Sequence, residues 1–330
     1  MLSADCWVLV LPMFATSILS FLLVFSFAFA PHRDPSFKVG GGTIDVNLDS
    51  DLSQATQDQL MTWVHDAGNA IVAYYGRFPL SHTYLEVRSF DGRGVHNGHT
   101  FGVDNGGLIR ISVGTQSTPE ELKSDWMLTH EMVHLTFPSV AREHHWIEEG
   151  TAVYVEPIAR SRAGNWGKEH VWGEMMRDMH QGLPEEGDEG LDNTHTWGRT
   201  YWGGALFCLL ADIEIHERTH NRKGLDDALR AIMNDGGVIT NDWELDHAFS
   251  LGDKAVGVPV LEQLYARMKD KPVNVDLDQL WRQLGVSQQG GIATFDDKAP
   301  LTPIRQAITT GKPIKMGDGK FSVESLMSAK

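Results

Sequence analysis

The spacing of apolar residues along this chain of 330 residues changes once, near Thr118. Before that point, short segments rich in β-branched and aromatic residues predict strands, with one helical segment between them. After it, almost every segment has helical spacing. Strands that come first and helices that follow predict an α+β fold, because a doubly wound parallel sheet requires the two to alternate. The predicted strands are 43–48, 83–90 and 108–113, and the predicted first helix is 52–75.

The glycine-rich parts of the sequence predict where regular structure is interrupted. Residues 91–107 predict a loop before the strand 108–113, and the stretch 181–196 interrupts the helical part. We therefore expect one domain, with a small mixed sheet in residues 31–117 and a mainly helical part in residues 118–286. Residues 287–330 form a tail without a strong period, to which no element is assigned.

The N-terminal segment 7–30 contains no charged side chain and is long enough to cross a bilayer as a helix. It ends in A-F-A at 28–30, the small-residue pattern that precedes signal-peptidase cleavage. Asp5 before the segment and Pro31 after it are untypical of a cleaved signal. We expect residues 1–30 to be either a signal peptide or an N-terminal membrane anchor. The protein would then be extracytoplasmic (periplasmic or secreted), or anchored by residues 7–30, and would contact the membrane only through that segment.

The charge balance argues against nucleic acid as a partner. Asp and Glu number 44 against 28 Lys and Arg, and the resulting net charge of -16 repels phosphate backbones. Only two cysteines are present, which excludes a disulfide-stapled scaffold. Cys208 lies in an apolar run and is predicted to be a buried thiol.

An H-E-x-x-H motif at residues 130–134 carries the strongest chemical signal. On a helix, residues four apart share a face, so His130 and His134 can offer two imidazole nitrogens to one metal ion. Glu131 lies on the adjacent flank, where its carboxylate can reach a water activated by the metal. A helix is predicted around the motif by an N-cap, a proline at the first helical position, a capping-box acid and a terminating proline: Thr118, Pro119, Glu121 and Pro138.

A catalytic zinc site needs a third protein ligand and an open fourth position. A second predicted helix, which ends before Pro157, contains W-I-E-E-G at 146–150, and Glu149 is the favoured ligand. Glu148 points about 100° away on an ideal helix, so the two carboxylates cannot serve equally. Gly150 is expected to let this helix approach the motif helix closely. The other candidates are expected to face solvent: Glu148, Glu156, His144 and His145.

The H-E-x-x-H and W-x-x-E-G motifs together resemble those of the gluzincin metallopeptidases, which include the aminopeptidase N and glycyl aminopeptidase families. The gap between the two motifs is shorter here than in aminopeptidase N relatives. The resemblance implies a zincin-like catalytic domain with one zinc ion per chain. It implies His130, His134 and Glu149 as the zinc ligands and Glu131 as the general base.

Two further segments extend the resemblance. Y-W-G-G-A at 201–205 is similar to the Y-x-K-G-A segment of these families, with Gly203 in place of the lysine. It implies that Tyr201 stabilises the transition state. G-V-D-N at 102–105 is similar to G-x-M-E-N of aminopeptidase N relatives, which implies that Asp104 holds a substrate's amino group. Gly- and Asx-rich turns are common, so a turn without a binding role is the favoured explanation of this second match. The predicted strand 108–113 beside it is open to pairing with an extended peptide.

Taken together, these features predict an exported zinc-dependent peptidase that acts on a peptide or protein substrate through a zinc-activated water and a glutamate base. The alternative is a catalytically inactive zincin-fold protein that binds peptides or envelope material, against which the intact motif argues. A structural zinc protein would need a fourth protein ligand. Aminopeptidase activity is favoured slightly over endopeptidase activity, and that choice depends on Asp104 alone.

Overall fold

The computed structural model describes residues 35–49, 52–290, 292–312, 314 and 321–329. These residues belong to one compact unit, Asp34–Lys330. The predicted signal peptide or anchor, residues 1–30, lies outside the described residues. Within the described part of the chain, no helix combines the length and the apolar composition that a membrane crossing requires.

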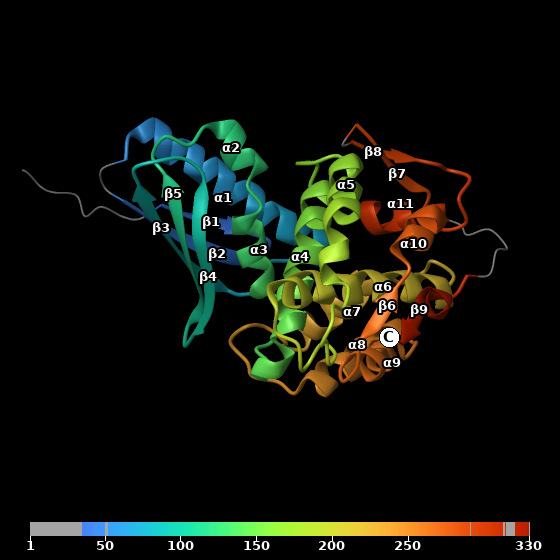
Figure 1. Ribbon diagram of the computed structural model, residues 1–330. Coiled ribbons are helices and arrows are strands. Elements are labelled where there is room, and N and C mark those ends of the chain that lie inside the picture. Colours follow the sequence, from blue (N-terminus) through green and yellow to red (C-terminus); the bar gives the residue numbers. More distant parts are fainter. Residues whose placement is uncertain (1–34, 50–51, 291, 313, 315–320, 330) are drawn as a thin grey trace, which may run out of the picture. The chain divides into compact units, whose positions relative to one another are not determined.

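A five-stranded mixed sheet forms the first half, in the order β1-β2-β3-β5-β4 (Figure 1). The strands are β1 (Ser36–Val39), β2 (Gly42–Leu48), β3 (His82–Phe90), β4 (Val95–Val103) and β5 (Gly106–Gly114). The central strands β2, β3 and β5 run parallel, and the edge strands β1 and β4 pair antiparallel with their neighbours. The three predicted strands are confirmed. Because alternate residues of the central strands are buried, one face of the sheet packs against helices.

The predicted loop 91–107 is wrong, because most of it is the edge strand β4. The middle of this strand lacks the apolar alternation that identifies a strand, and a bulge between His96 and His99 interrupts its pairing with β5. Asn97 within the bulge has a φ of 54°. The expectation that strand 108–113 pairs with a peptide is also wrong. That strand is β5, which lies between β3 and β4, so the free edge on this side of the sheet belongs to β4.

Helix α1 (Gln54–Tyr75) confirms the predicted first helix and covers the buried face of the sheet. Ser53 caps its start by accepting a hydrogen bond from the backbone N–H of Thr56, and Gly76 ends it in the left-handed conformation. A Cβ added at Gly68 would lie 3.4 Å from Val39 on β1, so the helix and the sheet are in close contact there. The predicted apolar stripe is buried: Leu60, Trp63, Val64, Ala67 and Ile71.

The single helix predicted after Thr118 is two helices, α2 (Pro119–Ser124) and α3 (Met127–His134). The predicted capping box is present at the start of α2. At Asp125 the backbone becomes extended, and its side chain then accepts a hydrogen bond from the N–H of Leu128 at 3.3 Å. Arg160 donates to the backbone carbonyls of Lys123 and Asp125, which satisfies acceptors left over at the break. The motif helix α3 therefore starts at Met127 as a helix separate from α2.

The remainder of the chain is mainly helical (Figure 1). Its helices are η1 (Arg142–His144), α4 (His145–Arg162), α5 (Lys168–Asp178), η2 (Met179–Gly182), η3 (Arg199–Gly203), α6 (Gly204–Arg218), α7 (Leu225–Asn234), α8 (Leu245–Val256), α9 (Val260–Met268), α10 (Leu277–Leu284), α11 (Thr302–Thr310) and η4 (Val323–Leu326). Two short antiparallel pairs accompany them, β6 (Val273–Val275) with β9 (Met327–Ala329) and β7 (Val286–Gln289) with β8 (Ile292–Phe295). The unassigned tail thus contributes strands and helix α11.

Two predictions about α4 are wrong. The helix continues through Pro157 to Arg162, although an interior proline removes an N–H donor and crowds the carbonyl four residues earlier. The residues on both sides of Pro157 are buried, and this packing outweighs the local cost. Gly150 does not face the motif helix. A Cβ on Gly150 would collide with the backbone of Gly204, so this glycine lets α4 approach α6. That approach places η3, which precedes α6, beside the start of α4.

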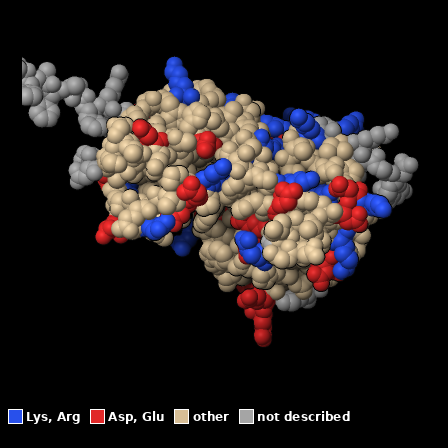
Figure 2. Space-filling model, turned by 90° about the horizontal axis from the view of Figure 1, so that it is seen from above, with Lys and Arg blue, Asp and Glu red and all other residues tan. Residues whose placement is uncertain are grey.

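The surface carries both signs of charge. On the face shown in Figure 2, the side chains of Lys and Arg are interspersed with those of Asp and Glu. Cys208 on α6 is buried, as predicted. The expectation that nucleic acid is not a partner stays a prediction.

Candidate metal centre

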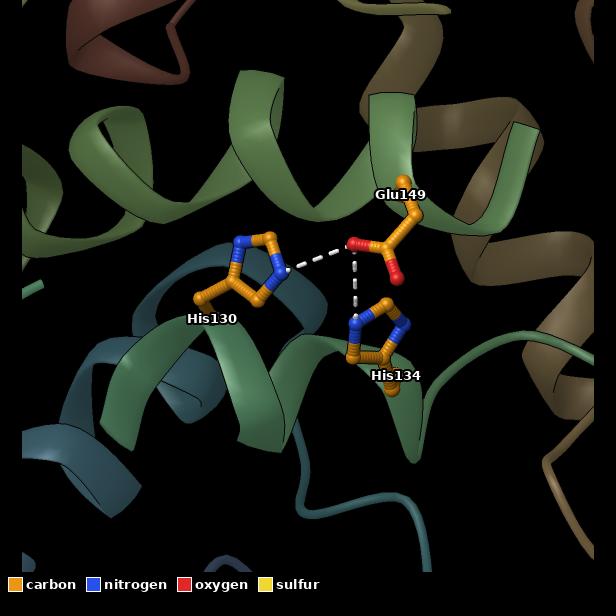
Figure 3. A group of neighbouring side chains, drawn as sticks. All are labelled: His130, His134 and Glu149. Atoms are coloured by element: carbon orange, nitrogen blue, oxygen red, sulfur yellow. Dashed lines mark hydrogen bonds and ion pairs between the residues drawn. The ribbon is translucent and has the colours of Figure 1, made fainter. Parts of the chain in front are cut away.

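Three side chains of metal-ligand type converge where α3 packs against α4 (Figure 3). His130 and His134 extend from α3, and Glu149 extends from the first turns of α4. Nε2 of His130 lies 3.1 Å from Oε2 of Glu149, and Nε2 of His134 lies 3.5 Å from the same oxygen. The three ligand atoms lie within 4.8 Å of one another. The structure therefore brings together the residues that the sequence singled out as ligands.

This donor set fits zinc. Two imidazole nitrogens and one carboxylate oxygen are a ligand set of catalytic zinc sites. Bonds of about 2.0–2.2 Å in a tetrahedral arrangement separate neighbouring ligand atoms by about 3.3 Å. The distances of 3.1 and 3.5 Å between the histidine nitrogens and Oε2 of Glu149 are close to that separation. All three side chains are largely buried, so a cation among them would be shielded from bulk water.

Burial and neighbouring charge shift the pKa values of His134 and Glu149 in opposite directions. Burial lowers the pKa of His130, which favours the neutral ring that a metal needs as a ligand. Burial also opposes protonation of His134, but the contact with Glu149 outweighs it and raises the pKa of that ring. Burial alone would raise the pKa of Glu149, yet hydrogen bonds from the surrounding histidines hold it well below its usual range. The carboxylate of Glu149 is therefore ionised.

Ring packing sets the orientation of His130. Its Nδ1 is buried and has no hydrogen-bond partner among the described residues. The ring of Trp126 meets it edge-on with the centroids 5.1 Å apart, and the ring of Tyr201 stacks on it at 6.2 Å. Aromatic packing thus orients this ring. In many metal sites, a hydrogen bond from the second ring nitrogen has that function.

Glu131 lies beside the three ligands and is held by the edge strand. The hydroxyl of Thr100 lies 2.6 Å from Oε2 of Glu131 and 2.9 Å from its backbone carbonyl, and its single proton is shared between these two acceptors. Across the strand bulge, a Cβ added at Gly98 would lie 2.6 Å from Oε1 of Glu131. A side chain at this position would crowd that oxygen, and glycine leaves it uncovered on this side. The sequence did not predict these two contacts, because β4 had been interpreted as a loop.

Tyr201 lies in η3, a single turn of π-helix that leads into α6. Its ring stacks on Trp197 with the centroids 5.5 Å apart, and it lines the same cavity as the three ligands. Burial, followed by the charge of Glu149, raises the pKa of its phenol to about 12. The hydroxyl is therefore protonated at neutral pH and can donate a hydrogen bond. Turns of π-helix are frequent at functional sites, and sequence spacing does not reveal them.

A cavity of about 710 Å³ opens over this group. It is lined by residues of β4, α3, α4 and η3, together with Trp126, Phe137, Ser139 and Ile239. No Lys or Arg is among the described residues that line it. Asp104 is not among them either. It lies exposed in the turn between β4 and β5. The role that the resemblance implies for Asp104 stays a prediction.

Several side chains expected to face solvent have partners instead. Glu156 is buried and pairs with Arg160 at 2.9 Å, and burial raises its pKa to about 8. His144 lies 3.0 Å from Asp192. His145 is half exposed, but its two ring nitrogens lie 2.8 Å from Glu148 and 3.2 Å from Glu149. Hydrogen bonds to Glu148 and then Glu149 raise the pKa of His145 to about 10.

No protein-family model and no curated protein matches this chain. Among solved structures, an aminopeptidase N family protein from Idiomarina loihiensis matches with a TM-score of 0.57 at 12% identity, over 78% of this chain and 49% of its own. An M1 zinc metallopeptidase from Deinococcus radiodurans matches with a TM-score of 0.44 at 14% identity, over 71% of this chain and 50% of its own. The first match shows that the zincin-like α+β fold predicted from the sequence is correct. The chain spans about half the length of the solved structures that it matches.

Proposed function

We propose that this chain is a zinc-dependent peptidase with one zinc ion bound by His130, His134 and Glu149. One observation carries the proposal: these three side chains and Glu131 meet on the wall of a single cavity. The fold shared with an aminopeptidase N family protein supports it. Export through residues 1–30, and a peptide or protein substrate outside the cytoplasm, belong to the proposal and rest on the sequence alone.

The chain's own residues can perform the proton transfers of peptide hydrolysis. His130, His134 and Glu149 would hold the zinc ion, which when bound would supply Lewis acidity to polarise a peptide carbonyl and to lower the pKa of water. Glu131 takes the proton of the attacking water and returns it to the leaving amine. Because Thr100 already donates to Oε2 of Glu131, Oε1 is the oxygen available for this transfer. Tyr201 donates a hydrogen bond to the oxyanion that develops on the carbonyl.

The free edge of β4 is the proposed binding surface for the substrate backbone. Residues 97–102 of this strand line the cavity, and β4 has β5 as its neighbour on one side only. An extended peptide can add to such an edge through main-chain hydrogen bonds. A peptide bound in this way would run along the cavity wall beside α3, where His130 and Glu131 line the cavity.

The carboxylates that line the cavity are already engaged, which bears on the position of the cleaved bond. Glu131 accepts from Thr100, while Glu148 and Glu149 both contact His145. Oε1 of Glu131 is reserved for the proton transfer, so no further carboxylate oxygen is assigned to an α-ammonium group, and Asp104 does not line the cavity. We therefore propose that the enzyme cleaves bonds inside a peptide, in place of the aminopeptidase activity that the sequence favoured.

A pair of peptides that differ only in N-terminal acetylation tests both parts of this proposal. The zinc-loaded full chain should cleave both peptides at internal bonds, with rates within about tenfold of each other, because acetylation removes no contact. Loss of a charge-assisted ammonium contact, worth about 1.5–3 kcal/mol, would instead lower the rate by about 10–150-fold. A chelator should abolish both reactions. Zinc binding without cleavage across a peptide library would favour the non-catalytic binding protein. Cleavage of the free peptide alone would restore the aminopeptidase assignment and the role of Asp104.

Replacement of Tyr201 by phenylalanine tests the oxyanion role. We expect kcat to fall by about 10²–10³-fold, the usual cost of one oxyanion donor, with KM and zinc affinity nearly unchanged. The loss follows because the ring packing on His130 and Trp197 stays while the hydroxyl is removed. Tyr84→Phe is the matched control, since Tyr84 lies on β3 and does not line the cavity. A kcat within threefold of the wild type in Tyr201→Phe would show that the phenol has no part in the reaction.

A further inference from the structure

Each carboxylate oxygen of Glu149 has its own set of partners. Oε2 faces the Nε2 atoms of His130 and His134, whereas Oε1 lies 3.2 Å from Nε2 of His145. A carboxylate that binds a metal through one oxygen needs a donor on the other oxygen to keep it from rotating. His145 occupies the position of such a donor.

The other nitrogen of the His145 ring is also engaged. Nδ1 lies 2.8 Å from Oε2 of Glu148, whose Oε1 accepts a hydrogen bond from the backbone N–H of Val140 at 3.4 Å. Both ring nitrogens face carboxylate oxygens, so the ring bridges two acidic residues that are adjacent in the sequence. This bridge orients the ring and separates two like charges on the first turn of α4.

The first turn of α4 is itself fixed in place. Nε1 of Trp146 donates to Oδ1 of Asp192 at 2.8 Å, and the hydroxyl of Tyr265 donates to Oδ2 of the same residue at 2.7 Å. His144, directly before the helix, contacts Asp192 as well. The backbone that carries His145, Glu148 and Glu149 is therefore held by contacts outside the cavity. These contacts fix the positions from which the three side chains extend.

We infer that His145 is a positioning residue that orients Glu149 for zinc binding, an inference that rests on the metal site proposed above. His145 acts through Glu149 and is not itself a ligand. Its Nε2 faces Oε1 of Glu149, on the side of the carboxylate away from the two ligand histidines, and His145 is not part of the group whose ligand atoms converge within 4.8 Å. Neither the H-E-x-x-H motif nor the W-x-x-E-G motif contains this residue.

The test measures the zinc dissociation constant of the full chain by competition with a chelator. His145→Ala should weaken zinc binding by about 10–100-fold, the usual cost of losing an outer-shell partner of a ligand. His145→Gln keeps an N–H group within reach of Glu149 and should recover much of that loss. The matched control is His170→Ala on α5. His170 also pairs with a glutamate four residues on, and its side chain is 48% exposed against 51% for His145, but it does not line the cavity.

The outcomes separate this inference from the proposal on which it rests. A wild-type chain that binds no zinc would overturn the metal site and the role of His145 together. Zinc binding by the wild type with a dissociation constant for His145→Ala within twofold of it would overturn only the role of His145. The absorption spectrum of the cobalt-loaded chain gives a second readout. At saturating cobalt, His145→Ala should change the intensity of the bands without loss of a nitrogen ligand, and a lost nitrogen ligand would show that His145 binds the metal directly.

Discussion

Glu131→Gln is expected to lower kcat by about 10²–10⁴-fold, the contribution of a positioned general base. Zinc affinity should stay within about twofold of the wild type, because Glu131 is not one of the three converging ligands. Glutamine has nearly the same volume, and its amide oxygen can still accept the hydrogen bond that Thr100 donates to this side chain. The change therefore removes a proton acceptor without removing packing. Steady-state kinetics on an internally cleaved peptide, beside a zinc titration, measures both quantities.

The control for this variant is Glu143→Gln. Glu143 lies in η1 with its side chain 65% exposed, and it does not line the cavity. Its replacement should leave kcat and zinc affinity unchanged. Turnover by Glu131→Gln within tenfold of the wild type would contradict the assignment of Glu131 as the base, whatever the zinc content of the variant.

The local parts of the site could be predicted from the sequence. The spacing of His130 and His134 fixes their common face once the segment is helical. The capping residues before them start α2, and not the motif helix α3. The position of Glu149 directly before Gly150 favours it over Glu148, since two adjacent residues on a helix cannot point the same way. The structure places Glu149 with the histidines. These inferences needed only the geometry of one helix at a time.

What the sequence could not predict depends on contacts between distant segments. Strand β4 was missed because an edge strand with solvent on both faces has no apolar alternation, and its hydrogen bond to Glu131 was missed with it. The break between α2 and α3 at Asp125 is satisfied by Arg160, 35 residues away in the chain. Gly150 was expected to face the motif helix, but it faces Gly204, and a single helix gives no signal for that choice.

The bridge made by His145 shows the same limit at the site itself. In sequence, His145 is one of several histidines near the motif, and an exposed position on α4 is the simplest expectation. Only the structure shows that its ring nitrogens lie between Glu148 and Glu149. A pattern of H-x-x-E-E at the start of a helix would have been the signal, since residues three and four apart share a face.

Glu149→Gln is expected to weaken zinc binding by more than about 100-fold. The loss of a residue that only hydrogen-bonds to a ligand costs about 10–100-fold. The variant keeps the shape of the side chain but loses the negative charge that the surrounding histidines face. Activity should fall in parallel with zinc occupancy, and excess zinc should restore part of it. This dependence on zinc concentration distinguishes a lost ligand from a lost base, because Glu131→Gln should not respond to added zinc.

Glu174→Gln on α5 is the matched control for Glu149→Gln. Glu174 also contacts a histidine, His170 at 3.5 Å, but lies outside the cavity. It should bind zinc as the wild type does. Equal zinc affinities in Glu149→Gln and Glu174→Gln would show that Glu149 does not hold the metal.

The most direct test of the metal site is the zinc content of the purified full chain after zinc loading and dialysis, measured by elemental analysis beside Glu149→Gln. The three converging ligands predict about one zinc per wild-type chain and much less in the variant. A wild-type chain that retains no zinc would contradict the account, because His130, His134 and Glu149 would then be a buried cluster without a metal, and the proposed hydrolysis would lose its basis.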